Sequence, residues 1–586
     1  DHGLDLVGKS GTEFIQFSAT EPKDPLNGQG PMFMSRGLSN VQVSAGTNRT
    51  TPWIDQNQTY ASTPSKQVLI REYQVGVNGP VATGNLLGST AHQATAITGT
   101  QPAEPSVPAI AGNIGSWRDV KEQARNVLGI ELRDTDIGSV PLFLTDEYGR
   151  YLRGPNNLPQ LVTTTVVGGV NAVIEGNLAS PVATSGTFPA NYPIVALQNQ
   201  PYTAQSTGHT FLDDIAHFAV PVNGQTGAEL LADADTSPGN VPGAGEYDNE
   251  LLDAHFITGD GRGNENIGLT TIHTVFHAEH NRLVADIASK VNALPAADPT
   301  RLGFEAAGWG LGERLFQAAR MVNENEYQHL VFETFVRKIE PGIHAFAAYN
   351  PSINPDVSVE FSQAVYRLGH SMLNETIPRK NAGTISLFDG FLNPLAFSGT
   401  GPNASGANGL IAAANIAEGA ATQRSNEIDE FVTGALRNNL VGTPLDLPAI
   451  NIARGRDLGV PSLNNTRYQL WLQTGNAALF PYDSWNALAT AGALRHQESF
   501  VNFLAAYAKW PTITAATTVA AKRQAANNLI TLSQQLTPAG ADAAAFLAGT
   551  DNSSALPPFN GNYSRTKDAN GVPVLVGGLL DSPTGI

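Results

Sequence analysis

The pattern of hydrophobic and polar positions changes character near residue 251 of this chain. Beyond that point apolar residues recur every three or four positions, which is the spacing of one face of a helix. Leu269, Ile272, Phe276 and Leu283 are one such series. The same pattern predicts helices over 305–336, 357–372, 426–440 and several alanine-rich stretches of 486–548. We therefore expect a mainly α fold with long loops and short β insertions.

The stretch 75–250 has a different pattern, rich in Gly, Thr, Pro, Ala and Asn. Short β-branched runs at 161–167 and 193–197 lie between turn signals and predict strands. A short helix is expected over 118–132 and an amphipathic segment over 211–219, whose flanking His209 and internal His217 are interpreted as structural. We expect the region as a whole to form surface insertions.

Composition narrows the classes of function. The 586 residues hold 34 Lys and Arg against 52 Asp and Glu, so the net charge is −18, which argues against a nucleic-acid or anionic-membrane partner. Cysteine is absent, which excludes disulfides, thiolate catalysis and cysteine-ligated metals. No apolar run approaches the roughly 20 residues that span a bilayer.

A glycine-rich loop at 258–266 carries the first candidate chemistry, since it presents Arg262 and Glu265 just before the helix expected from residue 269. A loop braced by a buried helix can hold polar groups in one pose. His273, His277 and His280 follow on that helix. They lack the His-Glu-x-x-His pattern of zinc proteases, so we interpret them as structural.

The second candidate stretch is 446–457, an apolar run that looks strand-like and ends in Arg454, Arg456 and Asp457. Buried guanidinium groups need anions, which are supplied either by internal ion pairs or by a ligand such as a haem propionate. His370, in the expected helix 357–372, is either a hydrogen-bonded core histidine or a neutral imidazole ligand to a metal or haem iron.

Two stretches near the beginning complete the set. Asp1 and His2 are a carboxylate and an imidazole side by side, either in a disordered terminus or in a catalytic pair. Residues 50–60 alternate oxygen-bearing side chains around Pro52, which suits either an ordinary polar turn or a hard cation such as calcium. The chain starts abruptly at Asp1, so we expect it to be a fragment.

Together, and in this order, these stretches resemble the animal-type haem peroxidases of the peroxidase–cyclooxygenase superfamily. The motifs are Asp-His-Gly-Leu-Asp at the start, Gly-Asp-Gly-Arg-Gly-Asn-Glu, Tyr-Arg-Leu-Gly-His and Leu-Pro-Ala-Ile-Asn-Ile-Ala-Arg-Gly-Arg-Asp. The resemblance covers about half of the chain. Its loop lengths and acidic, cysteine-free composition are similar to those of the bacterial members, many of which are modules of very large secreted proteins.

The resemblance implies a catalytic pair, His2 as the distal histidine and Arg262 as the distal arginine. It also implies haem b as the cofactor, with ester links through Asp1 and Glu265.

On the opposite side of the cofactor, the resemblance makes His370 the iron ligand. Asn451 is then the hydrogen-bond partner of its imidazole. Arg454 contacts a haem propionate, and Arg367, in the same segment as His370, belongs to the cofactor-binding residues.

The resemblance also places a calcium site on Thr51, the carbonyl of Trp53, Asp55 and Asn57. One departure concerns this site: the family's acid after the distal histidine is replaced here by Gly3, so either Asp5 or water compensates or the calcium site is weak. Leu458 is a second departure, in place of the histidine that is common after the Arg-Asp pair.

The expected activity is reduction of hydrogen peroxide with oxidation of a small donor such as a halide, thiocyanate or phenol. The expected setting is extracellular, as part of a larger multidomain secreted chain. The alternatives are a fatty-acid dioxygenase on the same fold and a catalytically silent adhesion or matrix module. In the dioxygenases a tyrosine lies three residues before the proximal histidine, where this chain has Arg367, with Tyr366 one residue further away.

The chain is expected to be one haem peroxidase domain over 1–586. Within it we expect the distal helix end and calcium loop over 1–60, insertions over 61–250, the catalytic helical core over 251–470 and C-terminal helices and loop over 471–586.

Overall fold

A computed structural model describes most of the chain. The described residues are 12–15, 32–35, 56–89, 112–224, 226–305, 309–348, 350, 352, 357–399, 401–438, 445–482, 484–490, 494–549, 566–567 and 573–574. Asp1, His2, Thr51, Trp53 and Asp55 therefore lie outside the described residues, and their predicted roles stay predictions.

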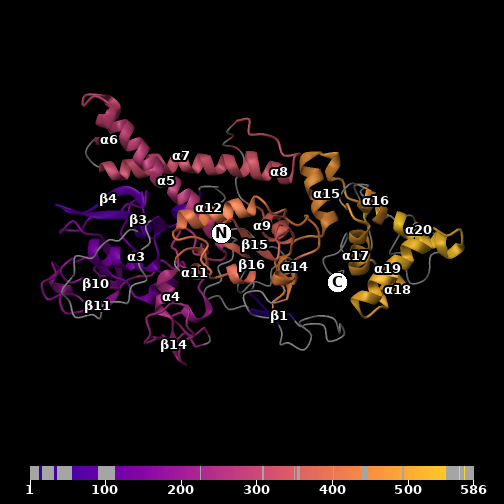
Figure 1. Cartoon of the computed structure of the whole chain (residues 1–586), viewed down its shortest axis with the longest axis horizontal. Helices are drawn as coiled ribbons and strands as arrows, with labels where there is room; N and C mark the ends of the chain where they lie inside the picture. Colours follow the sequence, from indigo (N-terminus) through magenta and orange to yellow (C-terminus); the bar gives the residue numbers. More distant parts are fainter. Residues whose placement is uncertain are drawn as a thin grey trace. The chain divides into compact units, whose positions relative to one another are not determined.

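The chain folds as two compact units. The large unit comprises Trp53–Asn354 and Glu375–Arg424, and the small unit comprises Asp1–Pro52, Pro355–Asn374 and Ser425–Ile586. Figure 1 shows helices predominating beyond residue 250 and short strand pairs before it, so the expected mainly α class is confirmed. The division expected at residues 60, 250 and 470 stays a prediction.

Short antiparallel hairpins support the first half of the large unit. Strand β3 (Arg71–Gly76) pairs with β4 (Gly79–Leu86), and β8 (Gln160–Val167) pairs with β9 (Val170–Glu175). Gly168 and Gly169 join the second pair with φ angles of 61° and 86°, the left-handed backbone that a two-residue hairpin turn requires. Every sheet in the described part of the chain has two strands.

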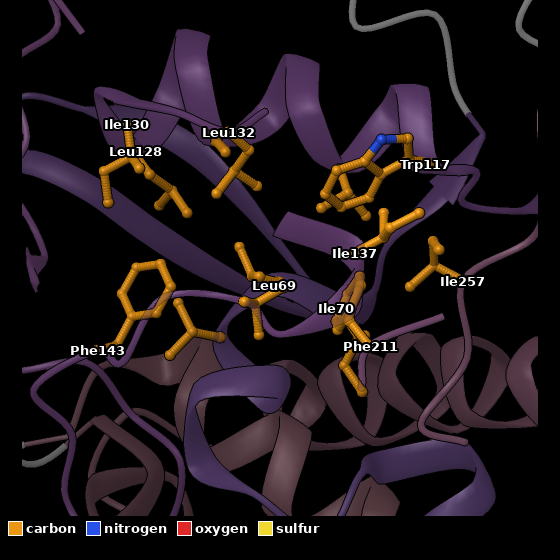
Figure 2. Close-up of a cluster of buried hydrophobic side chains, with 14 of the residues drawn as sticks. Leu69, Ile70, Trp117, Leu128, Ile130, Leu132, Ile137, Phe143, Phe211 and Ile257 are labelled. Carbon is orange, nitrogen blue, oxygen red and sulfur yellow. The ribbon is translucent and has the colours of Figure 1, made fainter. Parts of the chain in front are cut away.

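Both hairpins contribute side chains to the largest hydrophobic core among the described residues, which Figure 2 shows around Leu69, Trp117, Leu128 and Phe143. Most of its members come from 60–220, so the expectation that 75–250 is a set of surface insertions is wrong. The β-branched and aromatic residues there are separated by turns, and their common burial is a property of the folded chain. The run 161–167 is a strand as expected, whereas 193–197 ends in the short helix η3 (Val195–Leu197).

Long helices dominate the second half of the large unit. Helix α5 (Ile267–Ala293) begins at Asn266, whose side chain accepts a hydrogen bond from the Gly268 amide, and it packs against α7 (Leu311–His329) and α12 (Gly409–Ala420). Helix α7 continues into η5 (Leu330–Val336). The helix expected from residue 269 is confirmed, but Ile272, assigned to the buried face, is 49% exposed. The helix expected over 305–336 is also present but begins later, at Leu311, and ends as η5.

The buried face of α5 is only half apolar, since five of its ten buried residues are polar. Thr270, Thr271, Thr274 and His280 are buried there. Each of the three threonines donates a hydrogen bond from its hydroxyl to a carbonyl oxygen. Thr271 and Thr274 donate to carbonyls within the helix, and Thr270 donates to the Gly263 carbonyl of the preceding loop. Helical periodicity of apolar residues cannot reveal a face that is buried through hydrogen-bonded polar groups.

The other elements of the large unit are short. They are α1 (Asn57–Tyr60), α2 (Pro64–Ile70), β5 (Gly88–Ser89), β6 (Asn113–Ile114), α3 (Trp117–Gln123), η1 (Ala124–Leu128), β7 (Ile130–Glu131), η2 (Asp134–Gly138), β10 (Val182–Ala183), β11 (Ser185–Thr187), β12 (Pro201–Thr203), η4 (His217–Ala219), β13 (Leu231–Ala232), β14 (Glu246–Tyr247), α4 (Asn249–Ala254), α6 (Pro299–Glu305), α8 (Arg337–Ile339), β15 (Thr376–Arg379), β16 (Gly383–Ser386), η7 (Phe388–Gly390) and α11 (Pro394–Phe397).

The small unit is also helical. Its elements are β1 (Thr12–Ile15), β2 (Met32–Ser35), α9 (Val359–Gln363), η6 (Val365–Leu368), α10 (Gly369–Met372), α13 (Gly434–Arg437), α14 (Leu447–Asp457), α15 (Leu463–Thr474), η9 (Ala477–Leu479), α16 (Trp485–Thr490), α17 (Gln497–Tyr507), α18 (Pro511–Thr514), α19 (Val519–Ser533), α20 (Pro538–Ala548), β17 (Thr566–Lys567) and β18 (Pro573–Val574). The alanine-rich helices expected over 486–548 are confirmed and enclose a core around Leu504, Trp510 and Ala526.

Three expectations for this unit are corrected. The strand-like run at 446–456 is helix α14, begun by Asp446, whose side chain accepts a hydrogen bond from the Ala449 amide, and by Pro448 in the first turn. The helix expected over 357–372 is three short pieces, and that over 426–440 is reduced to α13 within its described residues. Among the described residues, none of the helices combines the length and the apolar character needed to cross a bilayer.

Candidate active site

The glycine-rich loop 258–266 of the large unit is closely packed against two other segments. A Cβ on Gly259 would lie 2.1 Å from the Asn57 carbonyl oxygen, and one on Gly261 would lie 2.6 Å from a carboxylate oxygen of Asp213. The Gly261 carbonyl also accepts a hydrogen bond of 2.9 Å from the Asp213 amide. Glycine is therefore needed at both positions, because the backbone approaches too closely for a side chain.

Arg262 is held in place by Asp260. Its Nε and Nη2 donate hydrogen bonds of 3.1 and 2.9 Å to the two carboxylate oxygens of Asp260, and its backbone amide donates to the same group. Burial, the largest single influence, would raise the pKa of Asp260, but the hydrogen bonds and the positive charge of Arg262 act together to lower that pKa. The pair fixes one orientation of a guanidinium that remains partly exposed, at 23% of its side chain.

Further carboxyls surround this pair. Burial, followed by the charge of Glu265, raises the pKa of Asp214 to about 8, against the opposing effect of Arg262. Burial likewise raises the pKa of Asp213, which Lys66 and Arg262 oppose. Asp214 Oδ2 is buried and has no hydrogen-bond partner among the described residues. Strongly perturbed groups gathered around one arginine are typical of functional sites.

Sequence reasoning identified Arg262 and Glu265 but missed Asp213, Asp214, Asp260 and Lys66. Asp213 and Asp214 lie in the segment 211–219, interpreted as merely amphipathic. The available signal was a pair of adjacent aspartates inside an otherwise apolar stretch. Asn57, predicted as a calcium ligand, begins helix α1 and lies against Gly259 of the same loop.

The histidines of α5 are structural, as expected. His280 Nδ1 is 2.8 Å from the Tyr60 hydroxyl and its Nε2 is 3.0 Å from the Gly84 carbonyl oxygen. His277 Nε2 is 2.9 Å from the Leu87 carbonyl oxygen, and His273 contacts the Gln58 backbone. Burial lowers the pKa of His273 to about 4 and of His280 to about 3, so both are neutral at pH 7. Each of the three makes at least one contact with the backbone of another segment, and His280 uses both ring nitrogens, which supports their interpretation as structural.

The small unit brings His370 and Asn451 together across 81 positions of sequence. His370 lies in α10 and Asn451 in α14, which packs against α9. The Asn451 amide group lies 2.9 Å from His370 Nδ1. Burial, and then the nearby charge of Arg367, lower the pKa of His370, so the imidazole is neutral at pH 7 with Nδ1 engaged.

The orientation of the Asn451 amide decides which imidazole nitrogen is available. With Nδ2 toward the ring, Asn451 Oδ1 is buried without a hydrogen-bond partner among the described residues. Rotating the amide by half a turn points Oδ1 at the imidazole, where it accepts a hydrogen bond from Nδ1–H. Nε2 then carries the free lone pair that an iron ligand needs. The pair therefore fits the axial ligand of a haem.

Two guanidinium groups accompany this imidazole. Burial lowers the pKa of Arg454, and repulsion from Arg367 lowers it further, against the opposing effect of Asp457. Two arginines close enough to repel one another form a positive region that favours an anion. Propionate groups of a haem have that charge, so Arg367 and Arg454 fit the cofactor as well. Each unit thus carries its own cluster: Arg262 and Glu265 in the large unit, and His370, Asn451, Arg367 and Arg454 in the small one.

Comparison with known proteins identifies the class. The model of the animal haem peroxidase family matches residues 222–519, more than half of the chain, and the chain belongs to that family. The matched range includes Arg262, Glu265, His370, Asn451 and Arg454.

Individual relatives are more distant. Peroxinectin A of Dictyostelium discoideum is 30% identical over 266 residues, 44% of each chain. Peroxidasin of Drosophila melanogaster is 31% identical over 36% of this chain and 13% of its own length, and thyroid peroxidase of Mus musculus is 30% identical over 36% and 22%. This chain thus spans less than half the length of these relatives. Among solved structures, peroxidase A from Dictyostelium discoideum aligns with 52% of this chain and 57% of its own at 22% identity and a TM-score of 0.32.

Proposed function

We propose that this chain is the catalytic part of a haem peroxidase that reduces hydrogen peroxide and oxidises a small donor such as a halide, thiocyanate or phenol. The contact between His370 and Asn451 carries the proposal, since it joins the iron-ligand candidate to the partner that sets its tautomer, within the range matched by the family. Haem b, when bound, would supply the redox chemistry of both half-reactions.

On the proximal side, His370 would bind the iron through Nε2. Asn451 would accept the Nδ1 proton and hold the ring in one orientation, as hydrogen-bond partners of metal-bound histidines do. Arg367 and Arg454 would pair with the propionates. A propionate beside them would reduce their mutual repulsion, which favours occupation of the site.

On the distal side, Arg262 would provide a fixed positive charge where negative charge develops on the departing oxygen of peroxide. Its pairing with Asp260 orients the guanidinium before substrate arrives. His2 would move a proton from one peroxide oxygen to the other, which a neutral imidazole can do as a base and then as an acid. Asp1 and Glu265 would hold the cofactor through ester links.

Calcium would bind at Thr51, the Trp53 carbonyl, Asp55 and Asn57. The close approach of the Asn57 backbone to Gly259 supports a role for this site in holding the loop of Arg262, since the two segments are packed together there. Such an ion would restrain α1 against loop 258–266. An extracellular setting and a larger multidomain chain belong to the same proposal.

The test is an absorption spectrum of the protein reconstituted with haem, before and after hydrogen peroxide. We expect a histidine-ligated Soret band that changes with peroxide and recovers with a reducing donor. His370→Ala should abolish the histidine-ligated band, and Asn451→Leu should keep it while weakening haem affinity by about 10–100-fold. His329→Ala, at an exposed histidine of α7, is the matched control and should behave as wild type.

The same experiment separates the alternatives. A folded protein without any haem band would support a catalytically silent module and contradict the proposal. A haem protein that consumes oxygen and a fatty acid in preference to peroxide and a small donor would be a dioxygenase. An unchanged spectrum in His370→Ala would assign the iron ligand elsewhere.

A further inference from the structure

Three carboxylates that belong to neither cluster above meet in the large unit. Asp233, Asp248 and Glu250 each offer an oxygen, and these oxygens all lie within 4.8 Å of one another. Strands β13 and β14 run parallel, and Asp233 and Asp248 follow their last residues. Because parallel strands end at the same edge, the two side chains meet there. Glu250 joins them from the first turn of α4.

Asp248 is fixed in position by the backbone. Its Oδ1 accepts a hydrogen bond of 2.6 Å from the Leu251 amide and its Oδ2 one of 2.7 Å from the Gly239 amide. Each carboxylate oxygen has a further lone pair for another partner. The Asp233 amide donates to the Tyr247 carbonyl at 3.0 Å, which holds the second carboxylate beside the first.

The other two carboxylates are incompletely satisfied. Glu250 is 1% exposed, and although its Oε1 accepts a hydrogen bond of 3.0 Å from the Asn249 side chain, its Oε2 is buried without a hydrogen-bond partner among the described residues. Asp233 is half-buried; both of its carboxylate oxygens are buried, and Glu250 of the same cluster is the one side chain close enough to share a proton with it among the described residues. A buried carboxylate oxygen without a partner is costly, so three in one place need an explanation.

No compensating cation from the described chain acts strongly on the cluster. The charges with the largest effect on the three groups come from carboxylates, namely one another, Asp235 and Glu246. Burial is the largest cause that raises the pKa of each group, and the repulsion between these carboxylates raises it too. The cluster is therefore stabilised either by shared protons or by an external cation.

We propose that Asp233, Asp248 and Glu250 bind a calcium ion, at a site distinct from the loop Thr51–Asn57. All donors are oxygens, which calcium prefers and zinc does not. Calcium binds oxygens at 2.3–2.6 Å, so two ligands of one ion are at most about 5 Å apart, which the observed spacing satisfies. Calcium also accepts an irregular set of six to eight ligands, which three carboxylates, carbonyls and water can complete.

Such an ion would hold α4 against the strand pair β13–β14. Helix α4 ends at Ala254, and the chain then enters the loop that carries Arg262. Calcium at the start of α4 would thus restrain the segment that leads to the candidate active site. Its contribution would be to local order and stability.

The test uses calcium-stripped protein in an Asp55→Asn background, which disables the other predicted site. Titration calorimetry should detect one calcium equivalent, and Asp233→Asn combined with Glu250→Gln should weaken its binding at least tenfold. Glu147→Gln, at an exposed carboxylate of the same unit, should leave it unchanged. No binding in the background protein, or equal binding in the double variant, would overturn the proposal in favour of shared protons.

A second measurement needs no variant. Hydrogen exchange of the wild-type protein in calcium should be slower than in chelator across residues 233–250, independently of any change at 51–60. Unchanged exchange over 233–250 would also overturn the proposal.

Discussion

The pKa of Asp214 shows how the surroundings of a single residue determine its protonation state. Within the part of the chain that the structure describes, the buried Oδ2 of Asp214 has no hydrogen-bond partner. Asp214 lies in the same charge cluster as Glu265, Arg262 and Asp260, and its pKa is raised to about 8, mainly by burial. At pH 7 it is therefore mainly protonated. A neutral carboxyl beside the Arg262–Asp260 pair leaves that pair's charges balanced, whereas an ionised one would add a third carboxylate to the group that includes Glu265.

This raised pKa predicts a stability effect of definite sign. An unfolded Asp has a pKa of about 3.9, so between about pH 4 and pH 8 the folded state keeps a proton that the unfolded state has already released. The stability contributed by Asp214 is therefore fully present below about pH 4 and is lost as pH rises through about 8. Asp214→Asn should match wild type at pH 4 and be more stable at pH 8, on the order of a few kcal/mol.

The measurement is the free energy of unfolding from urea denaturation at the two pH values. Exposed Glu147→Gln is the control and should show no such gain. A variant that is less stable than wild type at pH 8 would show that Asp214 is ionised and paired.

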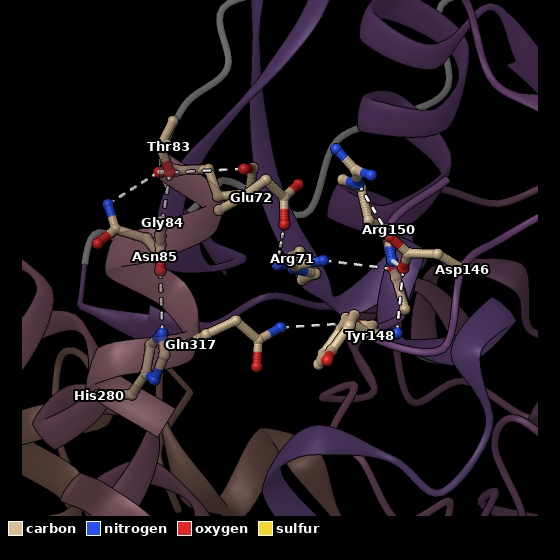
Figure 3. Close-up of polar contacts among 12 residues, drawn as sticks. Arg71, Glu72, Thr83, Gly84, Asn85, Asp146, Tyr148, Arg150, His280 and Gln317 are labelled. Carbon is tan, nitrogen blue, oxygen red and sulfur yellow. Dashed lines mark hydrogen bonds and ion pairs between the residues drawn. The ribbon is translucent and has the colours of Figure 1, made fainter. Parts of the chain in front are cut away.

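At the scale of elements, buried polar contacts join strands to helices. Figure 3 shows Arg71 of β3 among such contacts, with His280 of α5 bonded to Gly84 of β4 nearby. Arg71 is 1% exposed and donates a 2.5 Å hydrogen bond to Glu313 of α7, while its guanidinium lies 3.9 Å from the centre of the Phe316 ring. These contacts fix β3 against α7, and β3 leads on to β4, which packs on both helices.

Removing one partner of this ion pair should be strongly destabilising. Arg71→Met leaves the Glu313 side chain, 11% exposed, without its countercharge, and we expect a loss of about 3–5 kcal/mol in the free energy of unfolding. Adding Glu313→Leu should recover much of that loss. Lys290→Met, which breaks an exposed pair with Asp286, should cost less than about 1 kcal/mol. Equal costs for the two single variants would contradict the assignment.

At the scale of the whole molecule, stability should depend on pH through buried histidines. Burial lowers the pKa of His255 and His273 to about 4 and of His280 to about 3. An unfolded histidine has a pKa of about 6.5, so between pH 6.5 and 4 the unfolded state binds more protons. Stability should therefore fall as pH drops through this window.

His280→Gln tests this dependence, because glutamine can form hydrogen bonds but does not titrate. Measured in the Asp214→Asn background, which removes the opposing aspartate effect, the decrease in unfolding free energy from pH 6.5 to 4 should be smaller than with His280 present. His209→Gln, at an exposed histidine, should leave the decrease unchanged. A slope unaffected by His280→Gln would mean that this histidine is protonated in the fold.

Local signals in the sequence were sufficient for the long helices and for the motif residues. The helix from residue 269 and the alanine-rich helices near the C-terminus follow from periodicity and composition, since those signals act within a few turns. The signal for the start of α14 was equally local, because Asp446 and Pro448 are typical of a helix N-terminus. The apolar run after them was nevertheless interpreted as a strand. The order of short motifs was enough to predict the family, and with it Arg262, His370 and Asn451 as candidates.

Only the tertiary structure decided which distant residues share an environment. Asp213 and Asp214 reach the loop of Arg262, Asn451 reaches His370, and Asp233 meets Glu250 because strands and helices bring their ends together. It also decided that the polar side of α5 is buried and that 75–250 contributes most of a core. The reason is that burial and hydrogen-bond satisfaction depend on neighbours far apart in the chain, whereas helical periodicity and capping depend on residues within one or two turns.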